Sequence, residues 1–110
     1  MFEIKIEPNT NLLEETLYAL RFFGESPENV LFVTDGENYY SFQEFVEDAK
    51  DINYYDGYYL IEINSELKIV GKDFWLERGH DDGAEWWSFK RIPKKENYTY
   101  SNRLQIKEKK

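Results

Sequence analysis

The chain has 110 residues, of which 41% are hydrophobic and 18% aromatic, a composition that suits one domain with a modest, ring-rich core. Cysteine is absent, which excludes disulfide bonds, thiolate metal ligands and cysteine nucleophiles. The sequence has no signal-peptide pattern and no apolar run near the roughly 20 residues of a membrane span. We therefore expect a cytoplasmic protein that makes no contact with a membrane.

Charge is distributed unevenly along the chain. Residues 1–89 carry 20 acidic and 6 basic side chains, whereas residues 90–110 carry 8 basic side chains against Glu96 and Glu108. An acidic body repels the phosphates of nucleic acid, so direct binding to nucleic acid is expected only through the basic tail. The alternative is that the tail folds back on the acidic body. We predict a compact domain over residues 1–92 and a basic C-terminal extension over residues 93–110.

Two helices are predicted from their capping residues and apolar spacing. The first begins after Asn11, whose side chain can cap it together with Glu14, and it stops before Gly24. The second begins after Ser41, which forms a capping box with Glu44. Apolar residues at helical spacing give the second helix one buried face: Phe42, Phe45, Val46 and Ala49.

Short β-branched or alternating apolar runs, separated by Asp, Asn and Gly, predict strands along the rest of the chain. Their expected positions are residues 2–6, 30–34, 58–63, 67–71, 73–79 and 84–92, with a last edge strand at 103–107. Tyr39-Tyr40 is expected to pair back on residues 30–34. The predicted fold class is therefore α+β, a single domain in which two helices pack on one face of a mainly antiparallel sheet.

The stretch FWLERGHDDGAEWWSFK, residues 74–90, predicts a β-hairpin that turns at Asp82-Gly83. A two-residue turn pairs Arg78 with Trp87 and places Trp86 across from Gly79, whose bare backbone the ring can cover. One face then carries Phe74, Leu76, Arg78, His80, Glu85, Trp87 and Phe89, and the other carries Trp75, Glu77, Gly79, Trp86, Ser88 and Lys90. A four-residue loop would keep this division, and a three-residue loop would mix the two faces.

The same hairpin contains the chain's single histidine, His80, among four carboxylates: Glu77, Asp81, Asp82 and Glu85. These side chains define an alternative function, a small hydrolase or metal-dependent enzyme. The carboxylates lack a fixed ligand spacing, and the sequence has no nucleophile elbow and no glycine-rich phosphate loop. We favour a solvated acidic turn, and predict no catalytic residue, no metal and no cofactor.

Tyrosines and tryptophans offer a second kind of site. Tyr54, Tyr55, Tyr58 and Tyr59 flank Asp56-Gly57. Either alternate rings complete the core, or they join the hairpin tryptophans in a patch ringed by acidic residues that binds a protein partner. The candidate binding residues are Tyr55, Tyr58, Trp75, Glu77, Trp86 and Lys90.

Two stretches, ENVLFVTDGENYYSFQEFVEDA and LKIVGKDFWLERGHDDGAEWWSFKRIP, resemble a group of small uncharacterised proteins from Gram-positive bacteria and their phages and prophages. The similarity covers roughly residues 27–93. Its specific part lies at Asp73, Trp75, Leu76, Glu77, Arg78, Asp82, Gly83, Glu85, Trp86, Trp87, Phe89 and Lys90. Phe74 and the run Gly79-His80-Asp81 depart from the pattern of the group, which weakens a catalytic role for His80. The resemblance implies a fold unit with an origin in mobile elements, and no mechanism.

The function predicted from these features is a non-enzymatic, acidic protein-interaction module of phage or prophage origin. A sharper version is an inhibitor whose acidic body imitates nucleic acid and occupies a basic groove on a host factor.

Overall fold

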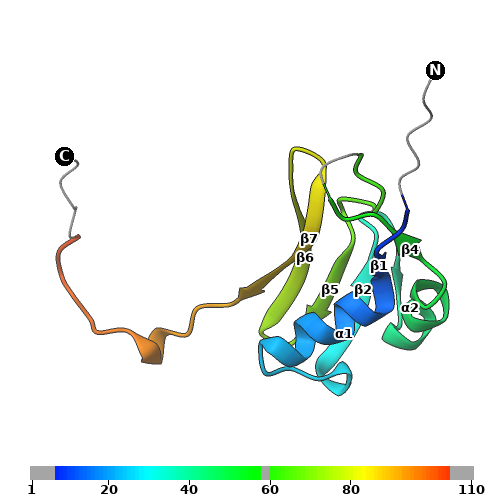
Figure 1. Ribbon diagram of the computed structural model, residues 1–110. Coiled ribbons are helices and arrows are strands. Elements are labelled where there is room, and N and C mark those ends of the chain that lie inside the picture. The colour runs from blue at the N-terminus through cyan, green and yellow to red at the C-terminus, as the bar shows by residue number, and fades with distance from the viewer. Residues whose placement is uncertain (1–6, 58–59, 105–110) are drawn as a thin grey trace.

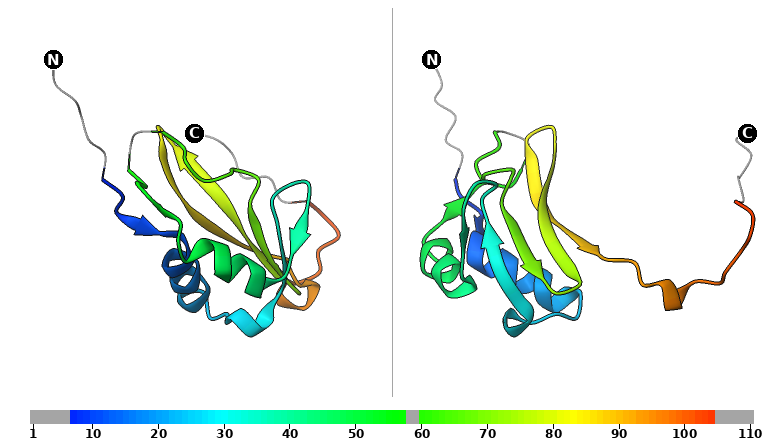
Figure 2. Two further views of the ribbon diagram at one scale, coloured as in Figure 1. Left: turned by 90° about the vertical axis from the view of Figure 1, so that its right-hand side faces the viewer. Right: turned by 180° about the vertical axis from the view of Figure 1, so that it is seen from behind.

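The computed structural model describes residues 7–57 and 60–104. Its main sheet is antiparallel throughout, with the strand order β3-β2-β5-β6-β7 (Figure 1). The strands are β2 (Val30–Thr34), β3 (Tyr39–Tyr40), β5 (Lys68–Gly71), β6 (Phe74–Asp81) and β7 (Ala84–Arg91). The helices α1 (Leu12–Phe22) and α2 (Phe42–Ala49) lie on the same side of this sheet (Figure 2). The predicted α+β fold is confirmed.

Both helices begin at the expected caps. The Asn11 side chain accepts a hydrogen bond from the Glu14 backbone N–H at 3.0 Å. At the second helix, the Ser41 hydroxyl accepts from the Glu44 N–H at 3.1 Å, and the Glu44 carboxylate accepts from the Ser41 N–H at 3.0 Å. Gly24 ends the first helix with a positive φ of 78°, a conformation that glycine adopts without a steric penalty. These local signals fix both helices in the chain.

A short two-stranded ribbon, which the sequence did not predict, connects the start of α1 with the end of α2. It pairs β1 (Thr10–Asn11) with β4 (Asn53–Tyr54) in antiparallel register. The Asn11 side chain also donates to the Lys50 carbonyl and to the Asn53 side chain, at 2.9 and 3.0 Å. The start of α1 is thereby tied to the end of α2.

The core lies between the two helices and one face of the sheet, here called the inner face. Leu20 from α1, Ala49 from α2, and Val33, Ile69 and Leu76 from three neighbouring strands are all fully buried. Side chains alternate along a strand, so the residues between these apolar positions point to the opposite face. Neither helix covers that opposite face of the sheet.

The hairpin of β6 and β7 adopts the predicted two-residue turn. Asp82 and Gly83 have φ values of 51° and 86°, as a type I′ turn requires. Arg78 then pairs with Trp87, and Gly79 pairs with Trp86. A Cβ atom on Gly79 would lie 2.6 Å from Nε1 of Trp86, so the indole occupies the space above the glycine. The division of the hairpin into two faces is confirmed.

The strand expected at residues 58–63 is wrong for its described part. Residues 60–63 form no strand. The backbone N–H groups of Glu62 and Ile63 donate instead to the Glu85 carboxylate, at 2.7 and 3.1 Å. Because a side chain satisfies these backbone donors, no neighbouring strand is needed there.

The chain leaves the domain after β7 (Figure 1). Over residues 93–104 it forms one short 3₁₀ turn, Lys95–Asn97, and a salt bridge from Lys94 to Asp73 at 3.3 Å. Arg103 and Leu104 lie in no strand, while residues 105–107 of that predicted strand, and all of the predicted strand 2–6, fall outside the described residues. The described part of the tail extends into solvent and does not fold back on the acidic body. Within the described ranges, no helix is both long and apolar enough to span a bilayer.

Candidate functional site

One face of the main sheet is left uncovered by both described helices (Figure 2). Register and alternation place ten side chains on this outer face. They are Phe32, Thr34, Tyr39, Lys68, Val70, Trp75, Glu77, Trp86, Ser88 and Lys90. Tyr39 is 79% exposed and Trp86 is 41% exposed, so the outer face presents large aromatic rings to solvent.

Hydrogen bonds along the strands hold both tryptophans of this face. The Trp75 indole donates from Nε1 to Glu77 Oε1 at 2.6 Å, and the Trp86 indole donates to the Ser88 hydroxyl at 3.3 Å. Each acceptor lies two residues further along the same strand and therefore on the same face. The rings are thus oriented before any partner arrives, which reduces the entropy lost on binding.

The structure brings together four of the six predicted binding residues. Trp75 pairs with Lys90 across β6 and β7, and Glu77 and Trp86 lie on the same face of the hairpin. Tyr55 belongs to a separate segment after β4, where it is partly buried and its backbone N–H donates to the Glu62 carboxylate at 2.9 Å. Tyr58 lies outside the described residues. The candidate surface is therefore the outer face without Tyr55.

The charge of the outer face differs from the expected acidic ring. Lys68 and Lys90 lie on this face with one carboxylate, Glu77. Exposed acidic side chains gather instead on α2 and the turn that follows it: Glu44, Glu47, Asp48 and Asp51. The acidic side chains of α2 and the aromatic rings of the outer face thus lie on opposite sides of the sheet.

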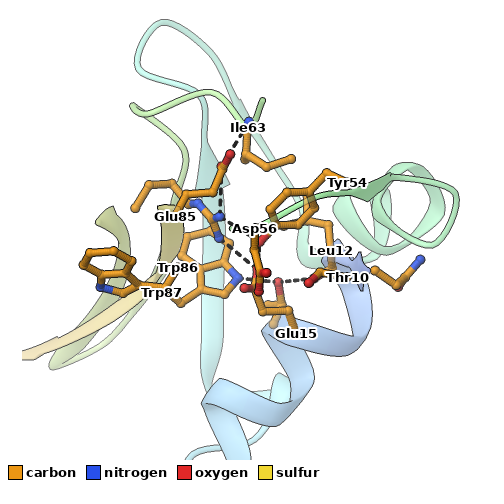
Figure 3. A network of polar contacts seen from close by, with 12 residues as sticks. Thr10, Leu12, Glu15, Tyr54, Asp56, Ile63, Glu85, Trp86 and Trp87 are labelled. Atoms are coloured by element: carbon orange, nitrogen blue, oxygen red, sulfur yellow. Dashed lines mark hydrogen bonds and ion pairs between the residues drawn. The ribbon is translucent and has the colours of Figure 1, made fainter. Parts of the chain in front are cut away.

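On the inner face, a buried polar network surrounds Arg78. Its guanidinium donates to Glu15 at 3.0 Å, to the Tyr54 hydroxyl at 2.9 Å and to Glu85 at 3.2 Å. The Tyr54 hydroxyl donates to the same Glu15 oxygen at 2.7 Å. The side chains of Arg78 and Glu85 are only 2% and 1% exposed. Figure 3 shows Glu15, Tyr54 and Glu85 approaching one another from α1, β4 and β7.

Aromatic rings enclose this network. The Arg78 guanidinium lies 4.6 Å from the centre of the Trp87 ring and 5.6 Å from that of Tyr54. The Trp87 indole donates to the Thr16 hydroxyl at 2.9 Å, and this hydroxyl donates to the Leu12 carbonyl at 2.7 Å. Arg78 Nε is buried and has no acceptor among the described residues. The network joins α1, β4, β6 and β7 around one cation.

The pKa values of Tyr54 and Arg78 in this network are both raised. Burial, together with the hydrogen bond to Glu15, raises the pKa of Tyr54 above its ordinary value, although Arg78 opposes this shift. Burial lowers the pKa of Arg78, but the hydrogen bond to Tyr54 and the charge of Glu15 more than offset it and leave this pKa raised. Tyr54 therefore stays neutral and Arg78 stays charged near neutral pH. The arrangement places a charged guanidinium and a neutral phenol at the centre of the fold.

The hairpin carboxylates and His80 do not form one site. Glu85 points inward to Arg78, which corrects its expected place in the exposed turn, because the register puts it on the inner face. Glu77 lies on the opposite face, while His80, Asp81 and Asp82 are exposed at the turn. Among the residues that the structure describes, no three His, Asp or Glu side chains are grouped so that they could hold a metal ion.

The chain is an α+β domain whose antiparallel sheet is packed against helices on one face and presents aromatic side chains on the other. Comparisons with protein-family models, with curated proteins and with solved structures gave no match.

Proposed function

We propose that the protein is a non-enzymatic interaction module that binds a protein partner through its outer face. The observation that supports this proposal is the set of aromatic rings, Tyr39, Trp75 and Trp86, on a sheet face that the helices leave uncovered. Tryptophan and tyrosine are enriched at protein interfaces and supply much of the binding energy there. A flat face of oriented rings suits a partner with an apolar centre.

The charges around the rings favour a protein over nucleic acid. Lys68 and Lys90 complement acidic side chains at the rim of a protein partner. A nucleic-acid strand would approach a chain with a net charge of −8, and its phosphates would meet Glu77 and the exposed Asp81 and Asp82. Repulsion of this kind makes nucleic acid the weaker candidate for the outer face.

Substitution of one ring tests the proposal. Trp86→Ala removes an exposed indole of the outer face, and Tyr100→Ala is the control because it removes an exposed ring of the tail, outside that face. Wild-type protein and each variant would be used as bait for host proteins, after circular dichroism has shown that each is folded. A partner of the outer face should bind wild type and Tyr100→Ala alike and bind Trp86→Ala about 30-fold more weakly. Equal binding to both variants would contradict the proposal.

A sharper proposal is that the protein is a phage or prophage inhibitor whose acidic side imitates nucleic acid. The exposed carboxylates on and after α2 support it, because they form an acidic surface away from the lysines of the outer face. The resemblance to small phage and prophage proteins fits the same purpose. Under this version, Glu47→Lys with Asp48→Lys should abolish capture, and duplex DNA or high salt should release the partner. Release by neither would contradict nucleic-acid mimicry while leaving binding through the outer face intact.

A further inference from the structure

Strand β7 is the edge of the main sheet and has a row of outward backbone groups. In a hairpin with a two-residue turn, residues facing each other alternate between pairs that share hydrogen bonds and pairs that do not. Counting from the Asp81–Ala84 pair, the backbone N–H and C=O groups of Glu85, Trp87, Phe89 and Arg91 point away from β6. The Glu85 N–H is already bonded to the Asp56 carbonyl at 3.2 Å. Among the described residues, no strand pairs with the other three.

An apolar groove runs beside this open edge. It has a volume of about 230 Å³ and is lined by Glu15, Tyr18, Ala19, Phe22, Phe23, Trp86 and Trp87. Tyr18 and Phe22 are 64% and 68% exposed, although the Phe23 ring next to them stacks on Phe89 of β7 at 4.4 Å. Long, unprotected edge strands flanked by apolar side chains favour pairing with another chain.

We propose that the partner at this edge is a second copy of the chain, paired antiparallel through β7 about a two-fold axis. Such an axis repeats every contact, as is usual in homodimers. With the axis at Phe89, Phe89 pairs with its own counterpart, and Trp87 pairs with Arg91 of the other copy. All three free residues of the edge are then hydrogen-bonded. Edge-to-edge pairing leaves Tyr39 and Trp75 of the outer face uncovered, whereas Trp86 also lines the groove beside the edge. The dimer goes beyond the proposed function, because it uses the strand edge and not the sheet face.

The residues that follow β7 fit this register. The pairing ends before Glu85 of the other copy, because the segment around Asp56 already occupies that part of the edge. Pro93 has no N–H to donate, so it ends the new ladder at this point, and the Glu85 N–H keeps its bond to the Asp56 carbonyl. The two exposed rings Tyr18 and Phe22 are brought against the second copy, because α1 packs on the inner face beside β7.

Charge complementarity supports a second copy in particular. The Ile92 N–H donates to the Asp73 carbonyl at 2.8 Å, so the chain keeps the direction of β7 as it enters the basic tail. Antiparallel pairing directs this tail toward the end of the sheet that carries the acidic hairpin turn, Asp81 and Asp82, of the other copy. Lys94 is paired with Asp73 of its own chain at 3.3 Å, which leaves Lys95 to meet that turn. The two-fold symmetry forms this attraction between Lys95 and the acidic turn twice in the dimer.

Sedimentation velocity of the full chain, from low to high micromolar concentration, tests the dimer with two variants at one position. Arg91→Pro removes an outward N–H and leaves the ladder to β6 intact, whereas Arg91→Ala removes the same side chain and keeps the N–H. We expect wild type to dimerise. Arg91→Pro should raise the dissociation constant about tenfold or more, because two hydrogen bonds are lost, one per copy. Arg91→Ala should stay within about threefold of wild type.

A cross-linking measurement gives an answer even if Arg91→Pro fails to fold. The chain has no cysteine, so a variant with Ser88→Cys and Lys90→Cys contains only the introduced thiols. In the proposed register residue 88 faces residue 90 of the other copy, and mild oxidation should give a covalent dimer in high yield. Glu47→Cys in α2 with Lys50→Cys at its C-cap serves as the control and should stay monomeric. A wild-type monomer at every concentration, equal weakening by both Arg91 variants, or equal cross-linking of the two cysteine pairs would overturn the proposal.

Discussion

Arg78→Met isolates the contribution of the buried network. Methionine keeps most of the side-chain volume between the Trp87 and Tyr54 rings, and it removes the positive charge that three groups share. Glu85, whose side chain is 1% exposed, then keeps only the backbone donors of the 60–63 segment. The variant therefore leaves a buried carboxylate without its counter-charge.

Breaking a buried ion pair by removing one partner costs about 3–5 kcal/mol. Arg78 Nε has no acceptor among the described residues, and its removal recovers part of that cost. We therefore expect the free energy of unfolding to fall by about 3 kcal/mol, a large share of the roughly 5–15 kcal/mol that stabilises a domain. Urea denaturation followed by tryptophan fluorescence measures this change, since Trp87 lies against the guanidinium.

Arg91→Met is the matched control. Arg91 also forms two ion pairs, with Glu25 at 2.9 Å and with Asp73 at 3.5 Å, but its side chain is 42% exposed. Solvent screens such pairs, so Arg91→Met should lower the free energy of unfolding by about 1 kcal/mol or less. Combining Arg78→Met with Glu85→Gln should cost less than the sum of the two single changes. Equal losses for Arg78→Met and Arg91→Met would refute the reasoning, because burial would then add nothing to the pair.

Two further predictions concern the hairpin and the alkaline stability. Trp87→Ala should lower the free energy of unfolding by about 3–5 kcal/mol because the ring is buried. His80→Ala at the exposed turn should change it by about 0.5 kcal/mol or less. Similar melting temperatures for the two variants would show that the assignment of these residues to a buried face and an exposed turn is wrong. The hydrogen bond from Tyr40 to Asp35 raises the pKa of Tyr40 from 10.0 to about 12. A raised pKa in the folded state stabilises the protein below pH 10.0, and this stability is lost as the pH rises from there to about 12. Tyr40→Phe should flatten that loss in denaturation curves at a series of alkaline pH values, and an unchanged slope would count against the Asp35 contact.

The elements that sequence predicted well are those that local chemistry defines. Asp82-Gly83 selects a two-residue turn, and turn length alone then fixes which residues of β6 and β7 face each other. Ser41 and Glu44 satisfy each other's backbone donors within one helical turn. Neither feature depends on distant parts of the chain, so both could be read from a few neighbouring residues.

The buried network could not be predicted in the same way, because its members come from distant positions. Glu15 lies 63 residues from Arg78 and 39 residues from Tyr54 along the chain. The register did place Arg78 and Glu85, two opposite charges, on the face that carries the apolar side chains of the hairpin. Buried charges are almost always paired, so this placement was a usable signal of an internal ion pair.

The candidate surface was predicted in part. Alternation along the hairpin grouped Trp75, Glu77, Trp86 and Lys90 correctly, because a strand's period of two is independent of the rest of the fold. Tyr55 does not lie on the outer face, since it follows β4, which pairs with β1 in a separate ribbon, and its N–H donates to Glu62. Both helices pack on the same side of the sheet, as predicted, but the sequence pattern did not reveal that the exposed carboxylates of α2 would thereby lie away from the hairpin tryptophans.

Binding through the outer face is tested most directly by site-specific photo-crosslinking in cells. A photoreactive phenylalanine analogue would replace Trp86 on the outer face in one experiment, and Glu47 on the acidic side of α2 in another. If the outer face binds a protein, the probe at position 86 should capture one partner and the probe at position 47 should not. Capture of that partner only from position 47 would contradict a binding role for the outer face.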